Sequence, residues 1–336
     1  MKNLLYIGNK LSQKGKTATT IDTLSQAFIA EGYAVKTASS KTNKIIRLLD
    51  MLLAIVKNRK WANYVLIDTY STQNFYYAYL CSQLCRFFNL KYLPILHGGN
   101  LPNRLKNNPK LSKAIFNKAY LNIAPSAYIQ SNFKDFGYNN IVIIPNAIAI
   151  ENYAFKHRKI EEIKLLWVRS FSEIYNPKLA VDILKALQDK GEIASLTMVG
   201  PDNDGSLQNT QVYAKSLNVE VNFTGKLSKR SWIKLSQDYN IFINTTNFDN
   251  MPVSIIEAMA LGLPVISTNV GGLPFLIKNG ETGVLVKPNN VEAFVLEILN
   301  FKENYEAVKV ITKQARNKVE TFSWTMVKEK WKSILV

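Results

Sequence analysis

The chain has 336 residues, of which 47% are hydrophobic and 20% are charged. This length exceeds the usual size of a single hydrophobic core, and the composition excludes a disordered or low-complexity protein, so we expect two ordered domains. Of the net charge of +17, residues 1–150 carry +14 (19 basic, 5 acidic) and residues 151–336 carry +3 (23 basic, 20 acidic), which favours an anionic partner for the first half.

Apolar runs of strand length alternate with amphipathic helical stretches from residue 3 onward. In the first half, strands are predicted at 3–8, 33–38, 63–67, 92–96, 120–123 and 141–144. After the charged segment KHRKIEEIK the rhythm restarts, with strands predicted at 164–168, 194–199, 219–223, 240–243, 264–266 and 283–286. The alternation predicts two α/β domains, each a doubly wound parallel sheet, over residues 1–150 and 151–320. Ligands should bind in a cleft between them, at the carboxyl ends of the strands.

The N-terminal run MKNLLYIGNK is too short for a signal peptide and is predicted to be a first buried strand. No apolar run approaches the length that spans a bilayer. Cys81 and Cys85 are four residues apart in an apolar helical run, which predicts buried free thiols and fits a reducing cytoplasm.

The loop after the first predicted strand contains GNKLSQKGKT. Six residues separate Gly8 from Gly15, whereas an ATP-binding P-loop needs four, so the spacing argues against an ATPase. Lys14 and Lys16 place positive charge beside the expected cleft.

Residues 44–61 predict an amphipathic helix whose apolar face packs on the sheet. That face comprises Ile45, Leu48, Leu49, Leu52 and Val56. Ile46, Met51, Leu53 and Ile55 widen it, and Lys44, Arg47, Lys57, Arg59 and Lys60 border it, a composition typical of an interfacial helix. We expect core packing for the apolar face and membrane contact for the basic border.

The stretch from Asn244 to Gly283 contains two acids, Asp249 and Glu257, separated by seven residues. Pro252 suits the first turn of a helix, with Asp249 or Asn250 near its N-cap and Glu257 inside it. A helix start with free N–H groups suits a diphosphate, and carboxylates accept hydrogen bonds from sugar hydroxyls. The alternative is that Asp249 only caps the helix and Glu257 is a solvated surface residue.

This stretch resembles the donor-binding signature of the retaining glycosyltransferases of family 4. In that signature an acid, seven residues and a glutamate followed by Ala-Met-Ala lead through a Gly-x-Pro-Val strand to a Gly-Gly turn. The residues that match are Gly262, Pro264, Val265, Gly271, Gly272, Gly280 and Gly283. The resemblance implies the GT-B fold, with two Rossmann-like domains and a last helix, 321–336, that crosses back to the first domain.

In the second half, the resemblance implies a donor site. Arg169, at the end of a strand, would grip the diphosphate and stabilise its departure, Asp249 would hold the transferred sugar, and Glu257 would hold the ribose. Lys226 and the helix start would complete the site; the helix start comprises Asn250, Met251, Pro252 and Val253. The family usually pairs the arginine with a lysine five or six residues on, but Tyr175 stands there, so either Lys178 reaches back or one cation suffices.

In the first half, the resemblance implies that Gly15 approaches the donor phosphate and that His97, which ends a strand before Gly98-Gly99, lies near the donor sugar. A structural histidine is the alternative. Lys16, Asn100 and Arg104 are candidates for contact with the acceptor.

We therefore expect a retaining hexosyltransferase that needs no metal and no cofactor, and that moves a sugar from a nucleotide diphosphate to a glycan or lipid-linked acceptor in cell-surface polysaccharide synthesis. We expect it in the cytoplasm, attached peripherally to the inner face of the cell membrane through its basic half. Two alternatives stay open, a GT-B sugar-nucleotide epimerase and a basic nucleic-acid-binding protein. The donor nucleotide, the sugar and the acceptor are not specified by these residues.

Overall fold

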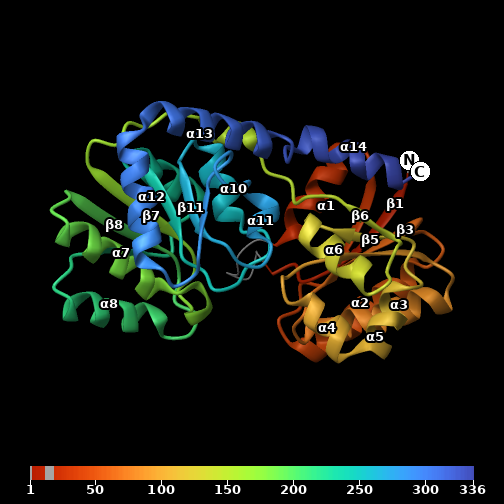
Figure 1. Cartoon of the computed structure of the whole chain (residues 1–336). Coiled ribbons are helices and arrows are strands. Elements are labelled where there is room, and N and C mark those ends of the chain that lie inside the picture. The colour runs from red at the N-terminus through yellow and green to blue at the C-terminus, as the bar shows by residue number, and fades with distance from the viewer. Residues whose placement is uncertain (1, 12–18) are drawn as a thin grey trace. The chain divides into compact units, whose positions relative to one another are not determined.

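The computed structural model describes residues 2–11 and 19–336, which form two compact units. Unit 1 comprises residues 1–147 and 324–336, and unit 2 comprises residues 148–323. Each unit contains one six-stranded parallel sheet with helices around it (Figure 1). All twelve predicted strands are present, with bounds that differ from the prediction by at most three residues. The predicted α/β class with two doubly wound domains is confirmed.

The sheet of unit 1 has the order β2-β1-β3-β4-β5-β6. Its strands are β1 (Asn3–Ile7), β2 (Ala34–Ala38), β3 (Tyr64–Thr69), β4 (Lys91–Leu96), β5 (Asn122–Ala124) and β6 (Ile141–Ile143). Its helices are α1 (Thr20–Ala30), α2 (Lys44–Asn58), α3 (Asn74–Phe87), α4 (Leu101–Asn107), α5 (Pro109–Phe116), α6 (Ala127–Asp135) and α14 (Trp324–Ile334).

Alternate residues of β1 pack into two separate hydrophobic cores, one on each face of the sheet. Leu4 and Tyr6 pack on one face of the sheet, in a cluster with Phe28 of α1 and Trp331 of α14. The rings of Phe28 and Trp331 pack edge to face, with their centroids 5.3 Å apart. Leu5 and Ile7 pack on the other face, in a cluster with residues of α2 and α3. The last helix of the chain therefore covers the first sheet.

The rotation of α2 differs from the prediction. Met51 and Ile55, which were expected only to widen the packing face, are fully buried, while Ile45 and Leu49 are 71% and 53% exposed. Arg47 lies on the buried side, where its Nε and Nη2 each donate a 2.7 Å bond to the carbonyls of Lys41 and Thr42. The buried side of α2 therefore comprises Arg47, Met51 and Ile55, and Arg47 is accommodated there because backbone carbonyls accept its N–H groups.

The cysteine prediction is confirmed. Cys81 and Cys85 are free and buried in α3. Burial raises the pKa of the Cys81 thiol to about 12, and that of Cys85 also rises through burial. Neither thiol is therefore a reactive nucleophile at neutral pH.

The sheet of unit 2 has the order β12-β11-β10-β7-β8-β9. Its strands are β7 (Ile163–Val168), β8 (Ala194–Val199), β9 (Asn222–Gly225), β10 (Ile241–Asn244), β11 (Val265–Thr268) and β12 (Val284–Val286). Its α-helices are α7 (Pro177–Asp189), α8 (Ser206–Ser216), α9 (Lys229–Leu235), α10 (Val253–Ala260), α11 (Leu273–Leu276), α12 (Val291–Glu303) and α13 (Tyr305–Glu320), and its 3-10 helices are η2 (Ile150–Asn152), η3 (Glu173–Tyr175) and η4 (Ser236–Asp238).

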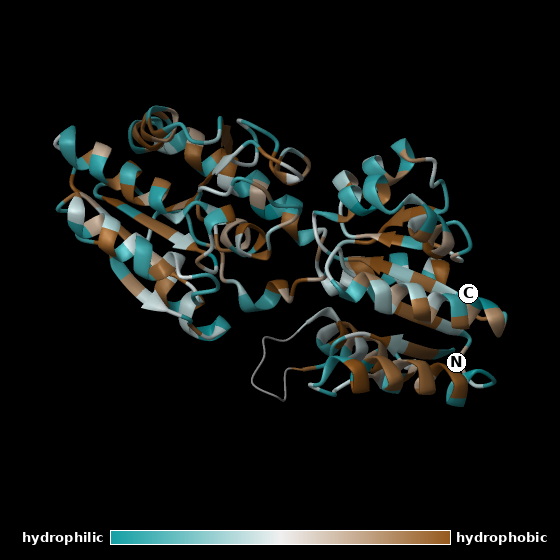
Figure 2. Ribbon diagram, turned by 90° about the horizontal axis from the view of Figure 1, so that it is seen from below, coloured by the Kyte–Doolittle hydropathy of each residue, from teal (hydrophilic) through white to brown (hydrophobic). Residues whose placement is uncertain are grey.

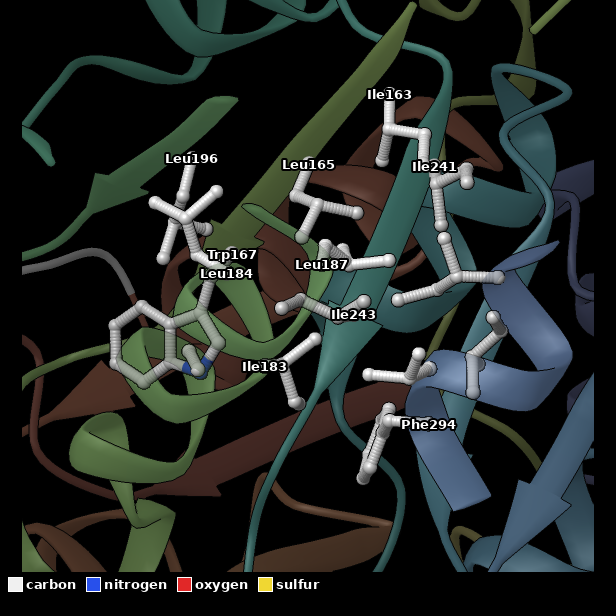
Figure 3. Packing of buried hydrophobic residues seen from close by; sticks show 14 of the residues in the cluster. Ile163, Leu165, Trp167, Ile183, Leu184, Leu187, Leu196, Ile241, Ile243 and Phe294 are labelled. Carbon is white, nitrogen blue, oxygen red and sulfur yellow. The ribbon is translucent and has the colours of Figure 1, made fainter. Parts of the chain in front are cut away.

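The main core of unit 2 lies between the central strands and the helices α7 and α12. Figure 3 shows Leu165 and Trp167 of β7 among side chains of α7, such as Leu184, and Phe294 of α12. In Figure 2 the strands of both sheets are largely brown, whereas the helices carry teal segments. Burial of the strands on both faces explains their continuous apolar runs in the sequence.

Candidate functional site

The candidate donor site of unit 2 lies where the strand order reverses. β7 and β10 are paired in parallel, Leu165 opposite Ile241, and the chain proceeds from them to opposite edges of the sheet. Ligands of such sheets bind outside the carboxyl ends of the strands at this point. Arg169 directly follows β7, and Asp249 follows β10 by five residues.

Hydrogen bonds hold the two loops together. The indole Nε1 of Trp167 donates to the hydroxyl of Thr245 at 3.0 Å. That hydroxyl lies 2.9 Å from the carbonyl oxygens of both Tyr175 and Asn176, and Asn247 N donates to Ile174 O at 2.7 Å. The loop after β10 is therefore fixed to the loop after β7.

Arg169 is the central cation of this site. Its Nη2 forms an ion pair with Asp249 Oδ2, and its guanidinium lies 4.2 Å from the ring centroid of Tyr175. Nε is buried and has no hydrogen-bond partner among the described residues. Burial lowers the pKa of Arg169. A half-buried guanidinium with an unused N–H is suited to an anionic ligand.

Tyr175, which takes the place of the expected lysine, thus supports Arg169 by stacking rather than by charge. Lys178 does not reach back to Arg169. Its Nζ lies 5.2 Å from the ring centroid of Tyr213 on α8. Lys178 therefore does not replace the lysine that is missing at Tyr175.

The Gly271-Gly272 turn positions Asp249 and Asn250. A Cβ atom on Gly271 would lie 2.1 Å from Asp249 O, and one on Gly272 would lie 2.1 Å from Asn250 O. Gly272 N donates to Asp249 O at 2.8 Å. Only glycine allows this close approach of two backbones.

The helix after Asp249 begins one residue later than predicted. α10 starts at Val253, with Pro252 as its N-cap in an extended conformation and without a side-chain cap. The alternative that Asp249 only caps this helix is wrong, because Pro252 is the N-cap residue and the Asp249 carboxylate pairs with Arg169. Ser254 Oγ, in the first turn, is buried without a partner among residues 2–11 and 19–336.

Glu257 is a buried residue of α10, with a side chain only 5% exposed, so the solvated alternative is wrong. Its Oε1 accepts a 2.7 Å hydrogen bond from the hydroxyl of Tyr153 and also pairs with Lys229 Nζ. Burial, with Glu257 as neighbour, raises the pKa of Tyr153. Oε2 has no hydrogen-bond partner in the described part of the chain, so one carboxylate oxygen is held and the other is available.

No sequence pattern indicated Tyr153 or Lys229 as site residues. Lys229 is three residues after Lys226, so the basic loop was located but the contacting residue was not. Lys226 itself is exposed directly after β9. Of the predicted helix start, Asn250 and Pro252 are buried, Met251 is half-buried and Val253 is exposed.

In unit 1, His97 belongs to a buried polar cluster at the carboxyl ends of β1, β3 and β4. Its Nε2 lies 2.8 Å from Asp68 Oδ1, which also accepts a 2.8 Å bond from the hydroxyl of Tyr6. The ring of Tyr70 stacks on the imidazole of His97, with the two ring centroids 4.9 Å apart. Asp68 Oδ2 is buried without a partner in the described ranges. Asp68 was not among the predicted site residues, although an acid in a fully buried strand is itself a signal.

The remaining residues predicted in the first half are placed differently. Arg104 donates from Nε to Ser71 O at 2.6 Å and from Nη1 to Asn108 Oδ1 at 2.9 Å, so it braces local loops. Asn100 precedes α4 as its N-cap residue. Gly15 and Lys16 lie outside the described residues.

If the chain transfers a sugar, as the resemblance implies, His97→Ala should lower the rate of transfer roughly a hundredfold, and nucleotide affinity much less, because the imidazole belongs to unit 1 and the candidate nucleotide site to unit 2. Steady-state kinetics and nucleotide titration would separate the two effects. His157→Ala is the matched control, since His157 is the other histidine and is exposed. A His97 variant that loses the fold would instead indicate a structural histidine.

No group of three or more His, Cys, Asp or Glu side chains in the described ranges is arranged to hold a metal ion. The Asp202-Asn203-Asp204 turn is hydrogen-bonded to the loop after β7. Asp204 accepts from the hydroxyl of Ser172 at 2.7 Å and from the backbone N–H of Glu173 at 3.1 Å.

A family model described as Glycosyl transferases group 1 matches residues 149–318, about half of the chain. The sulfoquinovosyl transferase SQD2 of Arabidopsis thaliana is 28% identical over 151 residues, which cover 43% of this chain and 28% of that protein. The UDP-Gal:alpha-D-GlcNAc-diphosphoundecaprenol alpha-1,3-galactosyltransferase of Escherichia coli is 24% identical over 196 residues, which cover 53% and 49%. The chain thus spans at most about half the length of these two relatives.

The fold is that of solved GT-B structures. Anabaena Alr3699/HepE, solved in complex with UDP, superposes with a TM-score of 0.80 at 16% identity, over 100% of this chain and 99% of that one. At this identity the likeness concerns the fold. The family match favours sugar transfer over the epimerase and the nucleic-acid-binding alternatives, which these comparisons do not support.

Proposed function

The chain belongs to the glycosyl transferases group 1 family, and from this premise we propose that it transfers a sugar from a nucleotide diphosphate to a hydroxyl of a glycan or lipid-linked acceptor. The observation that carries the proposal is the pair formed in unit 2 by the half-buried Arg169 and the buried Glu257. One offers an unused N–H group and the other an unused carboxylate oxygen.

Arg169 and Glu257 would bind different parts of the donor. The departing diphosphate gains negative charge, which Arg169 and the N-terminus of α10 would stabilise. Oε2 of Glu257 would accept hydrogen bonds from the ribose hydroxyls while Tyr153 and Lys229 hold Oε1. Asp249 would release Arg169 and turn to the transferred sugar. With charge supplied by the chain, we propose a reaction that needs no metal.

Retention of the anomeric configuration is proposed from the resemblance to family 4. A uridine donor is favoured because the Anabaena structure contains UDP and the Escherichia coli relative is named for UDP-Gal. A role in cell-surface polysaccharide synthesis is favoured because the latter name contains a lipid-linked sugar acceptor.

Attachment to an anionic membrane surface is proposed for the first half. Its net charge of +14 supports this, and a lipid-linked acceptor would be met there. In the described part of the chain no helix combines the length and hydropathy of a membrane span.

A thermal-shift panel of nucleotide sugars tests the proposed function. A donor at about a hundred times its Kd should add roughly 2.7 kcal/mol to the free energy of unfolding and raise Tm by several degrees. We expect the largest shift with a uridine diphosphate sugar. The donor should stay unchanged when no acceptor is added, whereas an epimerase would isomerise it. A shift with duplex DNA and none with any nucleotide sugar would contradict the proposal.

A further inference from the structure

Helices α2 and α3 each expose apolar side chains that the core does not use. On α2 the exposed side chains are Ile45, Ile46, Leu49 and Leu53, and on α3 they are Tyr76, Leu80 and Phe87, with exposed fractions from 39% to 78%. We call these seven residues the α2–α3 outer face. Each set recurs at helical spacing on the side opposite the buried residues, such as Met51 on α2 and Ala78 on α3.

The two helices lie side by side on one face of the sheet. Both contribute to the same core, through Met51 and Ile55 and through Ala78, Cys81 and Cys85. At their N-terminal ends, Lys44 Nζ donates to Gln73 Oε1 at 2.9 Å and the hydroxyl of Tyr77 donates to Lys44 O at 3.0 Å.

At their C-terminal ends, the guanidinium of Arg59 lies 5.6 Å from the ring centroid of Phe88. The outward rows of the two helices are therefore neighbours.

The charges around the outer face are almost all positive. Lys41, Lys44, Lys57, Arg59 and Lys60 flank α2, and Arg86 lies near the end of α3. Asp50 is the single acid of the two helices. A second copy of this chain would bring like charge to the same surface, which opposes self-association.

We infer that the α2–α3 outer face inserts into the headgroup region of an anionic membrane, with the flanking lysines and arginines on the lipid phosphates. The inference deepens the proposed function and rests on it for the source of the acceptor. An anionic bilayer supplies both an apolar layer and negative charge, which are the two properties this surface complements. The basic border alone would bind electrostatically, whereas the exposed apolar rows add insertion.

Vesicle sedimentation of the full chain tests the inference. The wild type should bind phosphatidylcholine vesicles that contain phosphatidylglycerol more tightly than pure phosphatidylcholine, and binding should weaken between 0.1 and 0.5 M NaCl. Leu49→Ser/Leu53→Ser should reduce binding to the anionic vesicles roughly tenfold or more. Leu296→Ser/Val310→Ser is the matched control, because Leu296 and Val310 are 58% and 56% exposed on unit 2, and it should bind as the wild type does.

A second measurement reports insertion directly. Leu53→Cys can be labelled selectively with a polarity-sensitive dye, since Cys81 and Cys85 are both buried. Its emission should shift to the blue on anionic vesicles, while the same dye on Val310→Cys should not respond.

Three results would overturn the inference: binding that ignores lipid charge and salt, a serine double variant that binds as the wild type does, or a wild-type dimer in solution that this variant abolishes. The serine double variant should keep the thermal shift with the nucleotide sugar. Loss of membrane binding is thereby distinguished from failure of the proposed transferase activity.

Discussion

Arg169→Ala should lower kcat/KM for sugar transfer on the order of 10²–10³-fold while the protein stays folded. The substitution removes the cation of the candidate diphosphate site and leaves Asp249 without its ion-pair partner. It also removes the guanidinium from the ring of Tyr175. Steady-state kinetics, with Tm measured in parallel, would separate lost turnover from lost stability.

Arg169→Lys keeps the charge and should still be impaired, because a lysine lacks the planar fork that stacks on Tyr175 and binds a phosphate with two N–H groups. Lys178→Ala is the matched control, since Lys178 lies over Tyr213 and away from Arg169. Turnover by Arg169→Ala within about twofold of the wild type would show that another group binds the diphosphate.

Glu257→Ala should weaken binding of the donor nucleotide roughly 10- to 150-fold, which corresponds to about 1.5–3 kcal/mol for hydrogen bonds to a charged group. The reason is loss of the carboxylate oxygen that is available to the ribose. Isothermal titration of the wild type and the variant with the nucleotide that gives the largest thermal shift measures the change.

Tyr153→Phe is the control for Glu257, because it removes the hydrogen bond that holds Oε1 and keeps the carboxylate. The affinity of Tyr153→Phe for the donor nucleotide should fall less than that of Glu257→Ala. Unchanged nucleotide affinity in Glu257→Ala would rule out the ribose role and leave Glu257 as a buried partner of Lys229 and Tyr153.

Much of the fold could be predicted because its signals are local. Strands buried on both faces require continuous apolar runs, and these runs were recognisable along the chain. The position of Glu257 inside a helix followed from the proline and the apolar residues around it. The family match shows a glycosyl transferase of group 1, whereas membership of family 4 in particular and retention stay predictions.

The contacts of the site could not be predicted in the same way. Tyr153 is 104 residues from Glu257, and Asp249 is 80 residues from Arg169. No local pattern connects such pairs. Tyr175 was noted only as a missing lysine, and its stacking on Arg169 emerged when the two loops were brought together.

The sequence by itself determined the class of fold, the strand positions and the segment that would carry the donor site. Burial requires a regular spacing of apolar residues, and tight backbone turns require glycine, so both signals are visible in short stretches of the chain. The tertiary structure alone decided which side of α2 is buried and which oxygen of Glu257 is available. The first depends on how α2 packs on the sheet, with Arg47 bonded to the carbonyls of Lys41 and Thr42 just before the helix. The second depends on Tyr153 and Lys229, which are distant from Glu257 along the chain. An apolar face on a helix predicts that something will cover that face. Only the packing of the whole chain decides whether the protein's own core does so.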